Sequence, residues 1–485
     1  MSGIAGLLPS GDKSEFRAED TRGRWIFALI LVLITLAELV FAYRHSDFNN
    51  DDLDHFALAA KSGLLAYMAT PVETIHIVPF HRLLTFLIYH IAPMNFMVAL
   101  GLLGCIHAVT LYYLCRISRL LQAGVFGSAI VLCYALSVLN IFLFVWWASA
   151  AHRIPYLALS ACATYHYLAS LREGAARRHA MIAVIAFVIG CGFYIKMVLV
   201  PFYLGVYGLA VTGFAIGTWR RALRLPIFLT GGSVIYFLAY SYFVHPAHAG
   251  LLLALQISGE YLLALLGNLI GFTLDTQFIQ VAGLFNTWTI GVISLWLGII
   301  LVTAWRNKRV AVYWLLLVGV VFLDFLPIAR SDRSVFFTDI VPYSVRYHAD
   351  ALVIVAVMLL IIAAALTRHE VACRQKARII LAIGTVSLYT VAMLINLRSD
   401  SNHRALMFST FGHAYMHNLR KGLQKIHEAQ PSFVTTPAPI GLDWAGNMPT
   451  SDRLVLLFRP EAKFDPMYGD YRVLMDGHVV STEPK

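Results

Sequence analysis

Long apolar stretches recur along this chain, and they constrain its fold more than any other feature of the sequence. A helix that crosses the hydrocarbon core of a bilayer needs about 20 apolar residues. The chain is 59% hydrophobic over 485 residues, and its mean hydropathy is +0.70, more apolar surface than a water-soluble protein of this length could bury. We therefore expect a mainly α polytopic membrane protein with about eleven transmembrane helices, near residues 25–43, 94–115, 123–142, 155–171, 179–195, 198–217, 226–243, 284–304, 311–328, 351–367 and 379–396.

Lys and Arg cluster in every second loop between these stretches, which is the pattern that orients helices in a bilayer. It accounts for the net charge of +10 and argues against nucleic-acid binding. The clusters, which we expect on the cytoplasmic side, are Lys13, Arg17, Arg22 and Arg24; Arg116 and Arg119; Arg172, Arg177 and Arg178; Arg220, Arg221 and Arg224; Arg306, Lys308 and Arg309; and Arg368, Arg374, Lys376 and Arg378.

This alternation predicts a multi-pass protein of the plasma (inner) membrane with a cytoplasmic amino terminus and, after an odd number of spans, an extracytoplasmic carboxyl terminus. The first apolar run is long and lacks a small-residue cleavage site, so we expect it to remain as a span. The segment 251–274 is apolar enough to lie along the membrane surface or to dip into it.

Three regions follow from this organisation. Residues 1–24 form a cytoplasmic segment, residues 25–396 a transmembrane domain with a first outer loop at 44–93, and residues 397–485 a small extracytoplasmic α/β domain. In the last region, residues 404–428 show apolar positions at helical spacing, and "YRVLMDGHVVST" predicts a hairpin around Asp476 and Gly477.

The first outer loop contains "HSDFNNDDLDHFALAAKSG", in which Asp47, Asp51, Asp52 and Asp54 lie close together. Acidic residues are favoured at and just inside the start of a helix, so these aspartates are consistent with capping in a solvated loop. Alternatively, one carboxylate at the membrane surface acts as a general base.

The following stretch, "ETIHIVPFHRLLTFLIYHIAPMNF", favours the second interpretation. Together with the paired aspartates it resembles the GT-C glycosyltransferases that use polyprenyl-phosphate sugars, in which the first outer loop reads like Asp-Asp-x-x-His followed by His-x-x-Pro-x-x-Arg-Leu. The matching residues are Asp51, Asp52, His55, His76, Pro79, Arg82 and Leu83.

Two later segments resemble that family more weakly. "GFYIKMVLVPFYL" places Lys196 and Pro201, although Ile195 stands where relatives often carry Glu, and "VRYHADAL" places Arg346 and Tyr347 before a late span. The resemblance covers most of residues 25–396. It implies a GT-C-like fold and an enzyme that moves a hexosyl or pentosyl group from a polyprenyl-phosphate carrier to a cell-envelope glycan, lipid or protein acceptor, with inversion at the anomeric carbon.

The chemistry of such a transfer fits these residue types. The leaving group is already an anionic phosphate, which needs cations, and the forked Arg side chain matches phosphate oxygens. The acceptor hydroxyl needs one base. Asp51 and Asp52 are neighbours whose side chains diverge by roughly 100° in a helix, so they are a poor match for the two flanking carboxyl groups of a glycosidase. We assign the base to Asp51 and binding or orientation to Asp52, and the reverse assignment stays open.

The candidate substrate-binding residues also have structural explanations. Arg82 and Lys196 could extend to lipid headgroups, and His55 and His76 could be ordinary hydrogen-bonded polar residues. Tyr347 could be an interface aromatic. Arg346, Arg330 and Arg333 all lie on the predicted outer side, where the orientation rule disfavours cations. Arg346 could pair there with Asp332, Asp339 or Asp350. His152 and Arg153 could line the same cavity or belong with Trp146 and Trp147 to an aromatic belt.

Asp51, Asp52 and Asp54 could offer oxygen ligands to Mg²⁺ or Mn²⁺. They do not form a complete ligand set, so we expect no metal and no other cofactor. Two other functions remain open: a transporter or flippase of lipid-linked glycans, and a polymerase or ligase that moves whole glycans. Both would be expected to place their functional residues elsewhere, near span centres or in a long late outer loop.

Overall fold

The computed structural model of the chain describes residues 21–49, 51–70, 77–171, 176–243, 248–270, 287–336, 338, 341–367, 375–397, 400–437 and 450–482. Within these residues, ten helical segments are long and apolar enough to cross a membrane, and a bent pair of helices brings the number to eleven. The predicted mainly α class with about eleven spans is therefore confirmed.

The ten segments comprise α1 (Thr21–His45), α5 (Phe96–Leu121), α9 (Ala176–Phe193), η2 with α10 (Ile195–Leu199 and Val200–Thr212), η3 with α11 (Ile216–Thr218 and Trp219–Phe243), α12 (Leu251–Asn268), α14 (Thr287–Arg306), α15 (Lys308–Ala329), α17 (Val345–Thr367) and α18 (Gln375–Leu397). The bent pair is α6 (Gly124–Ala135) and α7 (Val138–Phe144), which meet at 40°.

Two helices differ from the expectation. α12 is apolar enough to span the membrane and packs against α14, α15 and α17, whereas we expected this segment to lie at the surface or dip into it. The predicted span at 155–171 is part of α8 (Trp147–Ser170), which falls outside the ten candidate spans. α8 packs between α5 and α9 and is buried along nearly its whole length, so its polar side chains need no contact with lipid.

Burial separates the central helix from those at the outside of the bundle. In α17, 89% of the most apolar window is buried, whereas only 11% is buried in α18 and 17% in α14. In a bilayer the exposed apolar faces of the outer helices would contact lipid chains, which are as apolar as the side chains themselves. α17 therefore carries its residues into the centre of the molecule.

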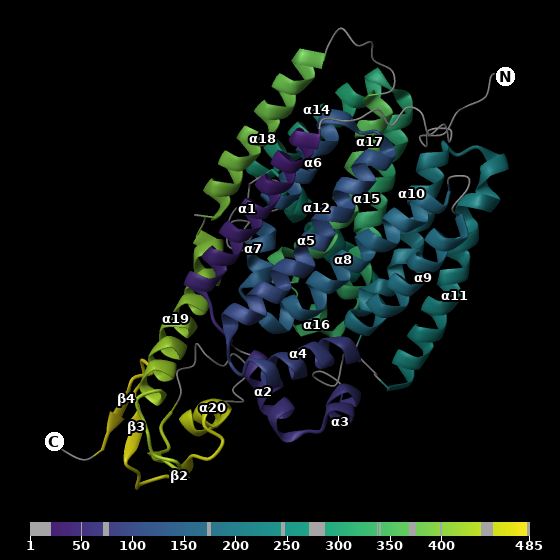
Figure 1. The fold of residues 1–485 in the computed structure, drawn as a ribbon. Helices are drawn as coiled ribbons and strands as arrows, with labels where there is room; N and C mark the ends of the chain where they lie inside the picture. The colour runs from purple at the N-terminus through teal and green to yellow at the C-terminus, as the bar shows by residue number, and fades with distance from the viewer. Residues whose placement is uncertain are drawn as a thin grey trace.

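Three short helices lie together across one end of the bundle (Figure 1): α2 (Asp51–Lys61), α3 (Leu64–Ala69) and α4 (Pro79–Ile91). α2 begins with three aspartates in its first turn, where the positive end of the helix dipole favours acids. α4 begins at a proline, which tolerates the first helical position because its missing N–H would have no partner there. Further short elements are α16 (Asp332–Phe336) and η4 (Val341–Tyr343).

The C-terminal region forms a small α/β unit, as predicted. It contains α19 (Asp400–Leu423), β1 (Ser432–Val434), α20 (Ser451–Phe458), β2 (Lys463–Asp465), β3 (Tyr471–Val473) and β4 (Val479–Ser481), with strand order β2-β1-β3-β4. β1 runs parallel to β2 and β3. The predicted hairpin is β3 with β4, antiparallel with Arg472 opposite Val480, and its turn places Gly477 at a φ of 86°.

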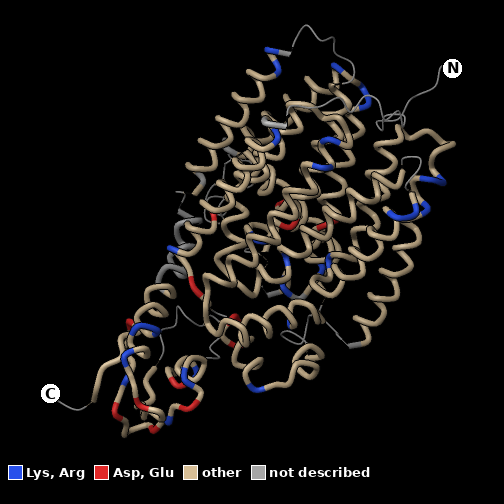
Figure 2. The backbone as a smooth tube through the Cα atoms, in the orientation of Figure 1, with Lys and Arg blue, Asp and Glu red and all other residues tan. Residues whose placement is uncertain are grey.

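This unit contacts the membrane domain at the end that carries α2, α3 and α4 (Figure 1). Both terminal nitrogens of Arg420, on α19, lie 3.2 Å from the carboxylate of Asp47, and one of them also donates to the carbonyl of Met94. His413 bonds the carbonyl of Ser46 at 2.9 Å. Figure 2 shows Lys and Arg at the opposite end of the bundle, and also within the C-terminal unit itself.

Candidate functional site

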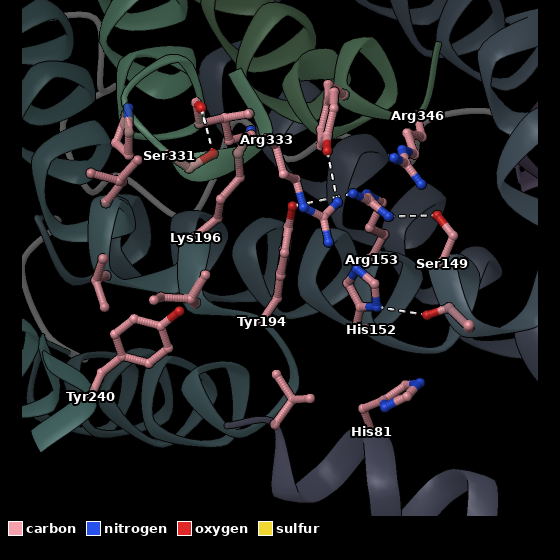
Figure 3. Close-up of a pocket in the computed structure, with 18 of the residues that line it drawn as sticks. His81, Ser149, His152, Arg153, Tyr194, Lys196, Tyr240, Ser331, Arg333 and Arg346 are labelled. Carbon is pink, nitrogen blue, oxygen red and sulfur yellow. Dashed lines mark hydrogen bonds between the residues drawn. The ribbon is translucent and has the colours of Figure 1, made fainter. Parts of the chain in front are cut away.

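A cavity of about 800 Å³ opens at the end of the bundle where α2 and α4 lie. Its walls come from the starts of α2, α4, α8 and α17, from residues 194–199, and from the ends of α11 and α15. Figure 3 shows side chains from these separate segments turned toward one another. The charged residues among its described lining are Asp51, Arg153, Lys196, Arg330, Arg333 and Arg346.

The two adjacent aspartates take different positions. Asp51 is half-buried and lines the cavity. Asp52 is fully buried and falls outside the cavity lining among the described residues. Its carboxylate accepts the backbone N–H of Asn49 at 3.0 Å and that of Ala148 at 2.6 Å, and so joins the start of α2 to the start of α8.

Burial also affects the ionisation of Asp52. It raises the pKa of Asp52 well above the usual value, and the two backbone hydrogen bonds oppose this shift only in part. A general base must be ionised before it can accept a proton. Of the pair, Asp51 is the better placed to act as a base.

His55 and Arg82 form a buried pair beside the cavity. His55 lines the cavity, and its Nδ1 lies 3.1 Å from Nη1 of Arg82. Arg82 is 2% exposed, its guanidinium lies 4.7 Å from the ring centre of Tyr67, and it is not among the described lining residues. The structure thus places Arg82 in the protein interior, behind His55.

Lys196 belongs to a buried network of paired charges. Its ammonium group lies 2.7 Å from Asp324 and 3.3 Å from Asp350. Asp350 also accepts a hydrogen bond from Nε of Arg153 at 3.0 Å and one from the hydroxyl of Tyr194 at 3.0 Å. All four charged side chains are nearly inaccessible to solvent. Two cations and two acids lie together, so their charges largely cancel.

Arg346 and Tyr347 lie where α17 begins. The Arg346 guanidinium packs over the rings of Trp146 and Tyr347, at 4.9 and 5.1 Å from their centres. Its Nε is buried without a hydrogen-bond partner among the described residues. The Tyr347 hydroxyl accepts a hydrogen bond from Arg333 at 2.8 Å. Asp350, named above as a partner that could pair with Arg346, binds Arg153 and Lys196.

Seven of the eight predicted site residues lie in the described structure. The cavity brings together Asp51, His55, Lys196, Arg346 and Tyr347, whereas Asp52 and Arg82 lie behind its wall. His76 falls outside the described residues. Within the described part of the chain, no cluster of three or more His, Cys, Asp or Glu residues is arranged to hold a metal ion.

The sequence interpretation did not assign a role to several residues of the cavity. The sequence indicated Arg333 indirectly, because it is a cation on the predicted outer side, where the orientation rule disfavours cations. Arg153 also stood out because it follows the tryptophan pair. His81 had no such signal, because a single histidine at the start of an amphipathic helix carries no motif.

Comparisons with known proteins give structural similarity but no sequence match. No protein-family model matches the chain, and no curated protein matches it. Two crystal structures of ArnT from Cupriavidus metallidurans are similar to it. The match to the structure bound to undecaprenyl phosphate covers 84% of this chain and 82% of the ArnT chain, at 14% sequence identity and a TM-score of 0.45. The match to the apo structure covers 85% of this chain and 82% of the ArnT chain, at 14% sequence identity and a TM-score of 0.47.

Proposed function

We propose that this protein is an inverting membrane glycosyltransferase of the GT-C type. It takes a sugar from a polyprenyl-phosphate carrier and transfers it to a glycan, lipid or protein acceptor of the cell envelope. The cavity faces the extracytoplasmic side, since the basic loops lie at the other end of the bundle.

One observation carries the proposal: among its described lining residues, the cavity presents one carboxylate, Asp51, and five cations. Arg153 and Lys196 are balanced by Asp350 and Asp324. The other cations of the described lining are Arg330, Arg333 and Arg346, which come from the wall formed by α15, α16 and α17. A cavity with this charge, at the end of a bundle of membrane helices, suits a lipid that carries an anionic phosphate.

The transfer follows from these positions. The acceptor hydroxyl loses its proton to Asp51 as its oxygen attacks the anomeric carbon. The bond between that carbon and the phosphate oxygen breaks on the opposite side, which inverts the configuration. The departing phosphate gains negative charge, and the guanidinium groups of Arg333 and Arg346 stabilise it.

The other site residues support this arrangement. Lys196 has three N–H donors. Its two acid partners use two of them, which leaves one donor for a phosphate oxygen. The hydroxyl of Tyr347, which accepts from Arg333, can donate to the same group. Asp52 positions Asp51 by joining α2 to α8, and Arg82 holds His55 in place.

The test is sugar transfer from labelled undecaprenyl-phosphate monosaccharides by membranes that contain the protein. Asp51→Asn is expected to lower the rate by about 100-fold or more because it removes the base, with little loss of thermal stability. Asp54→Asn is the matched control, because Asp54 lies on the same helix outside the described cavity lining, and it should transfer normally.

Asp52→Ala should act mainly on stability. It leaves the backbone N–H groups of Asn49 and Ala148 without their acceptor, which is expected to cost about 1–3 kcal/mol. Full transfer by the Asp51→Asn variant, or none by the wild-type protein with any such donor, would contradict the proposed function.

A further inference from the structure

His81 is a buried histidine that the proposed chemistry does not use. It lies in the first turn of α4, is 1% exposed, and lines the cavity. Neither of its ring nitrogens has a hydrogen-bond partner among the described residues. Figure 3 shows its ring on the side of the cavity opposite Arg333 and Arg346, below His152.

An unpartnered polar group of this kind is costly. A buried donor or acceptor without a hydrogen bond destabilises a protein by about 1–3 kcal/mol, and a histidine has two such nitrogens. Buried polar groups normally have partners, so an exception that faces a cavity points to a ligand that completes it.

The neighbours of His81 indicate what kind of ligand this is. Burial lowers the pKa of His81 to about 3, and the charge of Arg82 acts in the same direction, so the imidazole is neutral at neutral pH. A neutral imidazole offers one N–H donor and one acceptor nitrogen and brings no charge. It therefore suits a hydroxyl group, which both donates and accepts, better than a phosphate.

Two other histidines lie beside His81. The ring of His55 lies 5.4 Å from that of His81, and the ring of His152 lies 5.7 Å from it. Arginine can only donate, so Nδ1 of His55 accepts from Arg82, and the proton of the neutral ring is on Nε2. The carbonyl of Ala148 can only accept, so Nδ1 of His152 carries a proton. The cavity thus has a wall with three histidines and a cationic wall.

We propose that His81 binds a hydroxyl group of the donor sugar, while the phosphate of the same molecule lies against Arg333 and Arg346. The inference rests on the proposed function and adds a specificity residue to it. A sugar is joined directly to its phosphate, so a ligand whose phosphate occupies the cationic wall extends its ring toward the histidines. An acceptor would instead approach Asp51 from outside the donor.

The experiment compares two lipids in direct binding to the purified full-length protein: undecaprenyl phosphate and undecaprenyl phosphate that carries one hexose. His81→Phe is expected to weaken binding of the sugar-bearing lipid about tenfold, from the loss of one to two hydrogen bonds, and to leave binding of undecaprenyl phosphate unchanged. His81→Gln keeps a donor and an acceptor and should recover part of the loss.

His107 provides a matched control. It is also 1% exposed, with Nε2 lacking a partner, but it lies on α5 outside the described cavity lining. His107→Phe should change neither affinity. Both Phe variants remove an unsatisfied buried group, so neither should lower the melting temperature.

Equal binding of the sugar-bearing lipid by wild type and His81→Phe would overturn the inference and leave the proposed function standing. Loss of both lipids by His81→Phe would also overturn it, since the residue would then act on the phosphate or on the fold. Failure of the wild-type protein to bind undecaprenyl phosphate at all would contradict the proposed function and the inference together.

Discussion

Single residues around the cavity differ in whether the protein itself satisfies their polar groups. Asp52 and Lys196 are buried but bonded, to backbone N–H groups and to two carboxylates respectively. His81 is equally buried and lacks a partner among the described residues. Bonded groups such as Asp52 and Lys196 stabilise the fold. An unpartnered buried group such as His81 lowers stability, and its presence is explained by the binding of a ligand.

His81 should make stability depend on pH. Its pKa is about 3 when folded and near 6.5 when unfolded, so between these values only the unfolded chain takes up the proton. Stability is therefore lost as pH falls below 6.5, by about 2 kcal/mol between pH 6.5 and pH 5. Unfolding in detergent at pH 7 and at pH 5 should show a smaller difference for His81→Phe than for wild type.

Other buried groups also make stability depend on pH. Burial lowers the pKa of His55 and raises those of Asp47 and Asp52. These groups are present in both proteins, so the comparison isolates His81. An identical pH dependence in wild type and His81→Phe would show that the pKa of His81 is not lowered in the folded protein.

At the scale of elements, the loop between α1 and α2 is held from two sides. Arg420 binds the buried carboxylate of Asp47, and His413 bonds the carbonyl of Ser46. On the other side, the Ser46 hydroxyl donates to the carbonyl of Val145 at 2.6 Å, just before α8. The C-terminal unit therefore contacts the loop that leads directly into Asp51.

Arg420→Ala should consequently reduce both stability and transfer. Burial already raises the pKa of Asp47 and the charge of Arg420 opposes that rise, so its removal leaves a buried carboxylate poorly compensated. We expect a loss of about 1–3 kcal/mol in unfolding free energy and a several-fold slower transfer, as the start of α2 loosens.

The double variant Arg420→Ala with Asp47→Asn should recover part of the stability, because it removes the unpaired charge. His478→Ala is the control within the same unit: its pair with Asp476 is exposed and should contribute little. Wild-type stability and transfer in Arg420→Ala would show that the C-terminal unit does not position the loop.

At the scale of the whole molecule, charge and topology are consistent with each other. The C-terminal unit contacts residues that follow α1 directly, so it lies at the end of the bundle where α1 finishes. The clusters of Lys and Arg lie at the other end (Figure 2). Basic loops favour the cytoplasm, so we expect the C-terminal unit and the cavity to lie outside.

Cysteine labelling in intact cells tests this orientation. In a variant without the six native cysteines, Met467→Cys in the C-terminal unit should react with a membrane-impermeant maleimide. Arg309→Cys, near the start of α15, should react only after the cells are opened. Both residues are exposed in the structure. The reverse pattern of labelling would place the cavity on the cytoplasmic side.

The sequence alone determined the features that depend on neighbouring residues. The apolar stretches predicted the spans, and periodicity predicted the C-terminal helix and hairpin, because hydrophobicity and turn chemistry act over a few residues. Short motifs also named Asp51, His55, Lys196, Arg346 and Tyr347, all of which line the cavity. The prediction for α12 was wrong, because its apolar run did not show whether this helix would pack within the bundle.

Tertiary structure alone decided which of these residues face the cavity and which face one another. Lys196 meets Asp324 across 128 residues and Arg153 meets Asp350 across 197. Asp52, although adjacent to Asp51, turns to the backbone of α8, and Arg82 turns to His55. Such partners are set by how each helix is rotated and packed against others far along the chain, and local patterns do not contain that information.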